Sequence, residues 1–327
     1  MSHIIQSEEI VSGSTDQRKI TLGKSGDPEA QFEAGITCIN DLRDEDAVRY
    51  FKLAADQGYA RAQSMLSWGY FHGLGGLQQD EQMAFSLADA SAKQGDPFGE
   101  YLLGLYYANG IGVDKNNKAA AKWYKLSADQ GNAMSKADYG WLLIFGDNIP
   151  HDYERGCALL KEAYDEGVDT AAPCIARFYL DRDDTKNAAK WCRLAGETGD
   201  AKGWVMLGVL YENGDGVRKN LREAFKCYEN AKNLNDAEGK FHLSRMYLDG
   251  RGTKQNTKQG IHWLTESAEQ GYVKAQMRLA CCYIIKEYVE YNFEEGIKWF
   301  TAATNQGDED AAFFLEVLLH SDMAEEE

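Results

Sequence analysis

The residues that look most suited to chemistry lie near the start of the chain, where they resemble part of a nucleotide site. Gly23-Lys24-Ser25 matches the end of a phosphate-binding loop, in which the lysine contacts phosphates and the hydroxyl binds magnesium. The complete motif needs a glycine five residues before Gly23, but this chain has Arg18 there, and a polar stretch replaces the required strand. We therefore expect no nucleotide and no other cofactor.

Metal sites need histidine, cysteine or carboxylate side chains at characteristic spacings. The six histidines are dispersed and have neither an HExxH nor a Cys-x-x-Cys partner. Asp181, Asp183 and Asp184 resemble the start of a calcium loop, but the glycine and the distal glutamate of that loop are missing. A solvated turn is the favoured interpretation, and we expect no metal site.

Nucleophilic catalysis would need an activated serine or cysteine beside a base. The chain has no Gly-x-Ser-x-Gly elbow. Its seven cysteines are odd in number and irregularly spaced, which is typical of a reduced, cytoplasmic protein rather than of a disulfide framework. The sequence therefore predicts that the chain is not an enzyme.

Charge and hydropathy restrict the partners. With 52 acidic and 35 basic side chains, the net charge is -17, so the chain should repel nucleic acid and anionic membranes and favour a basic protein. The first residues lack a basic start and an apolar run, so we expect no secretory signal. No stretch approaches the roughly 20 apolar residues of a membrane helix.

A recurring glycine divides the chain into units of 32 to 37 residues, which indicates a repeat protein. Each dividing residue, called a cut residue below, should end a helix in the left-handed conformation that glycine, and next asparagine, adopts most readily. The cut residues are Gly26, Gly58, Gly95, Gly131, Gly167, Gly199, Asn235, Gly271 and Gly307.

Each unit reads as helix, loop, helix. Four, eight and twelve residues after a cut the side chains are small, large and mostly Tyr, so they share one face of a first helix. Eleven residues before the next cut stands Ala or Gly, and eight before it there is often an aromatic ring that should fill the gap between close-packed helices. The rings are Tyr50, Trp123, Trp191, Trp263 and Trp299.

These patterns resemble the Sel-one-like repeat (SLR) family, a relative of the tetratricopeptide repeats. The unit from Phe98 to Gly131 fits nearly throughout, whereas the first, fourth and eighth units are weaker matches. The resemblance implies an all-α, right-handed α-solenoid (superhelix) of about eight antiparallel helix-turn-helix repeats plus a final helix. We expect one solenoid over residues 26–320, a poorly ordered leader at 1–25 and an acidic tail at 321–327.

By analogy with tetratricopeptide geometry, the residues 3, 6, 10 and 13 positions after a cut should line the concave face. An aromatic stretch would then precede a more charged one. This order predicts a groove for a peptide or helix with an apolar segment and an acidic segment, since Trp, Tyr and Arg dominate interface energetics. Two alternatives stay open: the rings pack inside the fold, and the arginines pair within the chain. The candidates are Arg61, Trp68, Phe71, Tyr101, Leu105, Met134, Trp141 and Ile144, followed by Arg177, Lys202, Glu212, Phe241 and Arg245.

The family resemblance implies a non-catalytic scaffold or adaptor that binds a partner protein or peptide. Two alternatives are a bacterial binder of one cognate effector, such as a toxin-neutralising partner, and a hydrolase of the β-lactam type. The final helix (311–320) carries Phe313, Phe314, Val317 and Leu318 around its core positions and has no second helix to cover them. Either the tail folds back through Met323, or this end meets a partner or a second copy.

Overall fold

The computed structural model describes residues 26–325, and within that range it contains 17 helices and no strand, as the all-α prediction requires. The described residues form two compact units, 26–168 and 169–325. The first unit comprises α2 (Pro28–Asn40), α3 (Asp44–Ala55), α4 (Ala60–His72), α5 (Glu81–Ala92), α6 (Pro97–Asn109), α7 (Asn117–Asp129), α8 (Ala133–Phe145) and α9 (Tyr153–Asp165).

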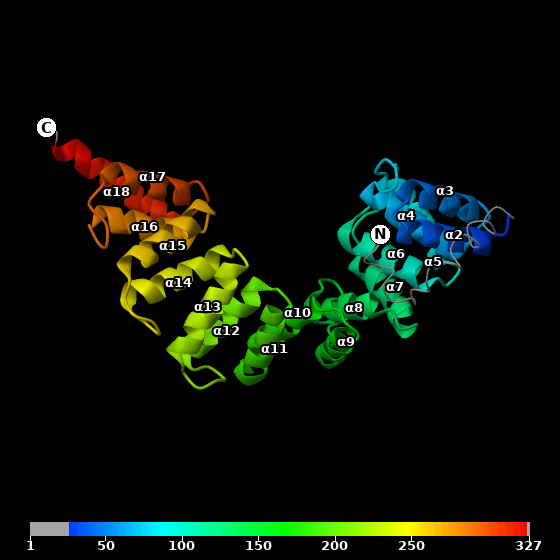
Figure 1. Ribbon diagram of the computed structural model, residues 1–327, viewed down its shortest axis with the longest axis horizontal. Helices are drawn as coiled ribbons and strands as arrows, with labels where there is room; N and C mark the ends of the chain where they lie inside the picture. Colours follow the sequence, from blue (N-terminus) through cyan, green and yellow to red (C-terminus); the bar gives the residue numbers. More distant parts are fainter. Residues whose placement is uncertain (1–25, 326–327) are drawn as a thin grey trace. The chain divides into compact units, whose positions relative to one another are not determined.

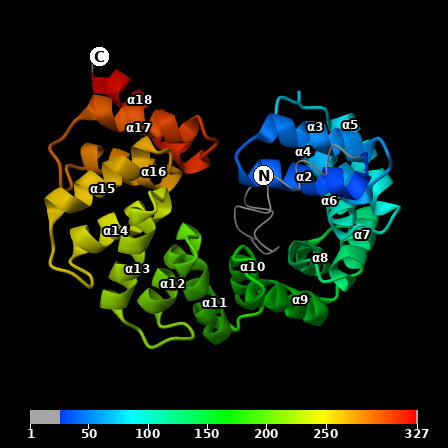
Figure 2. The ribbon, with the colours of Figure 1, turned by 45° about the vertical axis from the view of Figure 1, so that its right-hand side comes forward.

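The second unit comprises α10 (Ala171–Leu180), α11 (Thr185–Glu197), α12 (Ala201–Asn213), α13 (Leu221–Asn233), α14 (Ala237–Asp249), α15 (Thr257–Glu269), α16 (Val273–Ile284), α17 (Phe293–Thr304) and α18 (Glu309–Glu325). Within each unit, each helix packs on the next one along the chain, so that antiparallel pairs stack in sequence order (Figures 1 and 2). Each unit is therefore an α-solenoid, while the prediction of one uninterrupted solenoid over 26–320 stays a prediction.

The cut residues from Gly58 to Gly307 follow the second helices as predicted. All eight cut glycines, Gly26 included, have φ between 81° and 98°. Asn235 replaces glycine at one cut and has φ 60°, in the left-handed region that asparagine tolerates better than most residues. The chain therefore turns sharply at each cut and starts the next first helix. An aspartate or asparagine side chain caps several of these helices, as Asp96 caps α6 by accepting from the Gly99 N–H.

Glycines in the first helices let the two helices of a pair approach closely. A Cβ on Gly104 would lie 2.6 Å from the ring of Tyr124, and one on Gly208 would lie 2.5 Å from the ring of Tyr228. These rings stand seven residues before the next cut, one position after the aromatic series that the sequence pattern singled out. The correction has a simple cause: a shift of one residue turns a helical side chain by about 100°, from the flank of the helix toward its partner.

Polar side chains join successive repeats at a fixed register. Gln130 stands one residue before a cut and donates from Nε2 to Oε2 of Glu100, five residues after the previous cut, at 2.8 Å. The same two positions pair Gln57 with Gln31 and Gln306 with Gln276, in both cases at 2.8 Å. Because buried polar groups need partners, this ladder fixes how neighbouring repeats stack.

Both ends of the chain bear on predictions from the sequence. Arg18, Gly23-Lys24-Ser25 and the leader at 1–25 lie outside the described residues. At the other end, α18 continues as helix to Glu325, through part of the segment taken as the tail. Ala311 of this helix is fully buried, but Phe313 is 62% exposed and Val317 48% exposed. Its outer face is therefore apolar and open to water over the residues whose side chains the structure describes.

Candidate binding surface

The residues 3, 6, 10 and 13 positions after each cut lie on the first helices, and we call this set the first-helix face. In the first unit it is rich in aromatic rings. The Trp68 ring lies 3.9 Å from the His72 ring and 6.2 Å from the Phe71 ring, measured between centroids. Phe98 stacks on Tyr101 at 6.1 Å, with the planes 21° apart. The Trp68 ring lies 6.3 Å from that of Phe98, so rings from α4 and α6 form one cluster.

The predicted residues of this unit differ in how open they are. Five of them are half-buried, because one side of each side chain packs within the unit and the other side is accessible to solvent. These five are Arg61, Trp68, Phe71, Tyr101 and Leu105. The guanidinium of Arg61 lies 4.6 Å from the centre of the Phe32 ring. Of the three remaining candidates, Met134 is also half-buried. Trp141 is 44% exposed, whereas Ile144 is only 4% exposed and belongs to the core, contrary to its predicted place on the surface.

A pocket of about 230 Å³ opens on this face between α6 and α8. Leu105 of α6 and Trp141 and Phe145 of α8 form apolar walls, and Tyr124 of α7 contributes a phenol ring. Asp138 lies on the same face of α8 as Trp141, three residues away, and supplies a carboxylate to the lining. The pocket thus combines aromatic surface with a negative group.

Asp138 is an unusual residue for this position. The Tyr124 hydroxyl lies within hydrogen-bonding distance of its carboxylate. The negative charge of Asp138 also contributes to the raised pKa of Tyr101. Burial raises the pKa of Asp138 to about 6, although the Tyr124 hydrogen bond opposes that rise. The offsets used to predict the concave face do not include Asp138. A signal was present, because Met65 and Leu102 occupy the same position, seven residues after a cut, in other repeats.

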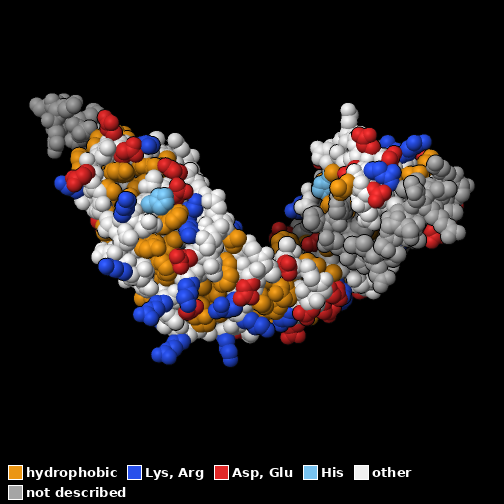
Figure 3. Space-filling model, in the orientation of Figure 1, with side chains coloured by type: hydrophobic (Ala, Val, Ile, Leu, Met, Phe, Trp, Pro, Cys, Tyr) orange, Lys and Arg blue, Asp and Glu red, His pale blue; other side chains and the backbone are white. Residues whose placement is uncertain are grey.

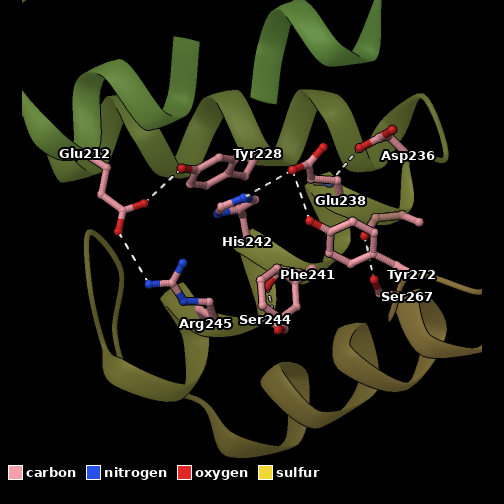
Figure 4. A network of polar contacts seen from close by, with 12 residues as sticks. Glu212, Tyr228, Asp236, Glu238, Phe241, His242, Ser244, Arg245, Ser267 and Tyr272 are labelled. Atoms are coloured by element: carbon pink, nitrogen blue, oxygen red, sulfur yellow. Dashed lines mark hydrogen bonds and ion pairs between the residues drawn. The ribbon is translucent and has the colours of Figure 1, made fainter. Parts of the chain in front are cut away.

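In the second unit the corresponding region is a polar network, shown in Figure 4. The Tyr228 hydroxyl donates to Oε2 of Glu212 at 2.9 Å. Oε1 of Glu212 lies 2.7 Å from Arg251 and 3.9 Å from Arg245. Burial is the main reason that the pKa of Tyr228 is raised, so the phenol stays protonated as a donor. The network therefore neutralises a mostly buried carboxylate with two guanidinium groups of the chain itself.

His242 lies at the centre of the same network. Its ring stacks on Tyr228 at 4.7 Å between centroids, and its Nε2 is 4.0 Å from Oε1 of Glu238. The Tyr272 hydroxyl donates to the same Glu238 oxygen at 3.0 Å. Burial, helped by the charge of Arg245, lowers the pKa of His242 and favours the neutral ring. Within residues 26–325, Nδ1 of His242 is buried without a hydrogen-bond partner.

The two predicted arginines of the second unit form contacts within the chain, whereas Lys202 is exposed. Arg177 is exposed, and its Nε lies 3.7 Å from Asp181 of the same helix region. Arg245, besides its contact with Glu212, lies 6.0 Å from the centre of the Phe241 ring. In Figure 3, hydrophobic side chains form a broken band on the visible face of this unit, and Lys and Arg lie along its margin. Arg245 therefore pairs within the chain, as the alternative interpretation of the arginines proposed.

The other chemistry suggested by the sequence has structural explanations. Asp184 caps α11 by accepting from the backbone and side chain of Asn187. Burial raises the pKa of the Cys192 and Cys227 thiols to about 12, so they remain protonated and weakly nucleophilic. Throughout the described range there is no cluster of His, Cys, Asp or Glu that could hold a metal ion.

Paired helices, left-handed cut residues and a repeating polar ladder define a helical-repeat protein of the α-solenoid class. The chain belongs to the Sel1 repeat family. Its seven matched repeats include the first, fourth and eighth units, which looked weaker by pattern, and leave 169–204 unmatched. Proteins of this family generally act as non-enzymatic mediators of protein–protein interaction. The matched residues are 28–59, 60–96, 97–132, 133–168, 205–236, 237–272 and 273–308.

Solved structures and a curated relative agree with this assignment. A protective antigen of uropathogenic Escherichia coli with an SLR fold matches 94% of this chain and 68% of its own, with 26% identity and TM-score 0.78. A Sel1 repeat protein from Oxalobacter formigenes matches 94% of this chain and 91% of its own, with 24% identity and TM-score 0.69.

The curated relative is the mouse DAP3-binding cell death enhancer 1. It is 30% identical over 156 residues, which are 46% of this chain and 31% of that protein. The chain thus spans about a third of the length of that relative. None of the helices between residues 26 and 325 has the length and apolar character needed to cross a bilayer.

Proposed function

We propose that this chain is a non-catalytic adaptor that binds a partner protein or peptide through the first-helix face of its first unit. The partner carries basic groups, because the chain has a net charge of -17 and the candidate pocket contains a carboxylate. The adaptor works in the cytoplasm and binds neither nucleic acid nor membranes.

One observation carries the proposal: Trp141 remains 44% exposed beside the pocket, although the fold buries or half-buries most large rings. Exposed aromatic side chains next to a concave surface are typical of interface anchors, because a ring loses little conformational entropy on binding and brings a large apolar area. The half-buried rings of Trp68 and Tyr101 extend the same surface onto α4 and α6. Adaptor function needs no reacting group at such a site.

The proposal is tested by affinity capture from the native cells, with the wild-type chain compared with a Trp68→Ala, Tyr101→Ala, Trp141→Ala variant. We expect the variant to lose the specifically captured proteins. Because Trp68 and Tyr101 also pack against other rings, circular dichroism must show that the variant is folded. The single variant Trp141→Ala removes only a partly exposed ring and repeats the test at lower structural cost. If both variants capture the same proteins as the wild type, the first-helix face is not the binding surface.

The final helix supports a second contact of the same class. Phe313 and Phe314 are 62% and 44% exposed, and their rings lie 5.9 Å apart on α18. Scattered apolar residues on a surface are ordinary, whereas adjoining exposed rings on one helix form an apolar patch of the kind that marks an interaction site. We therefore include self-association through α18 in the proposal.

A further inference from the structure

The two units contain the same local framework with different charges. Asp138 in the first unit and His242 in the second both stand seven residues after a cut. Each lies beside a tyrosine that stands seven residues before that cut, Tyr124 or Tyr228. Each tyrosine packs against a glycine of the first helix of its own pair. The two places can therefore be compared residue by residue.

In the second unit, arginine side chains of the chain itself neutralise the carboxylate beside the tyrosine. Glu212 accepts from Tyr228 and pairs with Arg251 at 2.7 Å and with Arg245 at 3.9 Å (Figure 4). Arg245 stands 10 residues and Arg251 stands 16 residues after Asn235. The second unit therefore shows a tyrosine-bound carboxylate together with the guanidinium groups that neutralise it.

In the first unit Ala108 stands at the position of Glu212, and the carboxylate comes instead from Asp138, which has no such cations beside it. Trp141 takes the place of Arg245, and Asp147 takes the place of Arg251, counted from the cut at Gly131. Both residues line the pocket that contains Asp138. Within residues 26–325, no ion pair joins Asp138 to a basic side chain of the chain. Asp138 is therefore hydrogen-bonded by tyrosine but forms no ion pair with a basic side chain of the described residues.

We propose that the pocket between α6 and α8 binds the guanidinium group of an arginine side chain from the partner protein. In this arrangement Asp138 accepts its N–H groups and the Trp141 ring lies against its plane. This proposal rests on the proposed adaptor function and names the chemistry of the partner residue that the first-helix face recognises. The arginine of the partner takes the role that Arg245 and Arg251 have beside Glu212 in the second unit.

The size and walls of the pocket fit one flat cationic side chain. Its volume of about 230 Å³ is below the roughly 300–1,000 Å³ of small-molecule sites. A guanidinium stacks on aromatic rings and binds a carboxylate through several N–H groups, whereas an ammonium is compact and strongly hydrated. Leu105 and Leu142 supply apolar surface for the methylene stem of the arginine.

The other charged and titratable groups around Asp138 determine the pH dependence. Tyr101 of α6 and Tyr124 of α7 have pKa values raised mainly by burial, so both stay neutral below pH 10. Lys115 and Asp147 are exposed residues of the pocket lining, and their opposite charges offset each other in part. Asp138 is therefore the group that changes charge near neutral pH, and arginine binding should weaken as the pH falls below about 6.

The test uses the full chain and two small probes, acetyl-arginine methylamide and its neutral citrulline analogue, in an NMR titration at pH 7.5. We expect the arginine probe to shift the indole N–H signal of Trp141, assigned through Trp141→Phe, and the citrulline probe to bind at least about tenfold more weakly. Asp138→Asn should weaken binding of the arginine probe by a similar factor. Asp165→Asn, an exposed acidic residue on α9, is the matched control and should leave binding unchanged.

Equal binding of the two probes, or unchanged binding by Asp138→Asn, would overturn the proposal. A lysine probe that binds as tightly as the arginine probe would overturn the choice of guanidinium. The result is separable from the adaptor function. If arginine fails to bind while Trp141→Ala still loses captured proteins, the adaptor proposal stands and the pocket proposal falls. If arginine fails to bind and Trp141→Ala also leaves the captured proteins unchanged, both the pocket proposal and the adaptor proposal fall.

Discussion

Asp138 lines an accessible pocket, but its carboxylate is mostly buried, and keeping it charged costs free energy. Burial raises its pKa to about 6 from the ordinary 3.8, so the folded state binds a proton more tightly than the unfolded chain does. The stability contributed by this proton is fully present below pH 3.8 and is lost as the pH rises through about 6. Perturbed groups of this kind concentrate at functional sites.

The cost gives a prediction for one substitution. Asp138→Asn should raise the free energy of unfolding at pH 8 by about 1–3 kcal/mol, because the amide keeps an acceptor for Tyr124 without the buried charge. The gain should shrink as the pH falls and vanish near pH 4. Urea unfolding of both proteins at pH 8, 6 and 4 measures it. If the variant is less stable than the wild type at pH 8, the charged carboxylate stabilises the fold, which contradicts the prediction.

Part of this surface could be predicted from the sequence and part could not. Trp141 was predicted because the analogy with tetratricopeptide repeats selects the tenth residue after a cut, and in α8 that residue is exposed. Asp138 was missed because the inward positions were taken from a related repeat, whose geometry includes no residue seven positions after a cut. Arg251 lies in a loop after α14, and its meeting with Glu212 depends on the path of that loop, which no helical period specifies.

At the scale of elements, the close approach of α6 and α7 depends on Gly104. A methyl group there would lie 2.6 Å from the Tyr124 ring, nearer than any ordinary contact. Gly104→Ala should lower the free energy of unfolding by about 1–2 kcal/mol, since overpacking outweighs the better helix propensity of alanine. In a Tyr124→Leu background the loss should shrink. Thermal and urea unfolding of the four proteins gives the coupling, and additive effects would show that the ring and the glycine do not compete for space.

Helix α18 carries the prediction of self-association. Replacing Phe313 and Phe314 with serine should shift the sedimentation profile toward monomer at concentrations at which the wild type associates, because the two exposed rings supply the apolar contact. Analytical ultracentrifugation over a range of concentrations measures the change. A wild-type chain that stays monomeric throughout would remove α18 as a contact between copies.

Helix ends were the most predictable elements. Every cut residue has the left-handed conformation inferred from glycine and asparagine alone, because few other residues adopt it without strain. The rings that fill the glycine gaps were placed one residue too early, since a repeat in sequence shows which residue types recur but not which side of a helix touches its partner. Tyr228 against Gly208 shows the observed register.

At the scale of the whole molecule, net charge restricts the choice of partner. A charge of -17 opposes the approach of phosphate backbones, and at low salt this repulsion is least screened. We expect no binding of a fluorescent 30-base-pair duplex at 50 mM salt in an anisotropy titration with up to 50 μM protein. Saturable binding that weakens with added salt would show a basic patch that outweighs the overall field.

The central claim is that the first-helix face of the first unit contacts another protein, and site-directed photo-crosslinking in the native cells tests it most directly. A photoreactive phenylalanine analogue replaces Trp141 on α8 in one protein and Leu126, which is 38% exposed on the second helix α7, in another. We predict discrete crosslinked products with other proteins from position 141 and none of these from position 126. Equal products from both positions, or products from position 126 alone, would contradict the account.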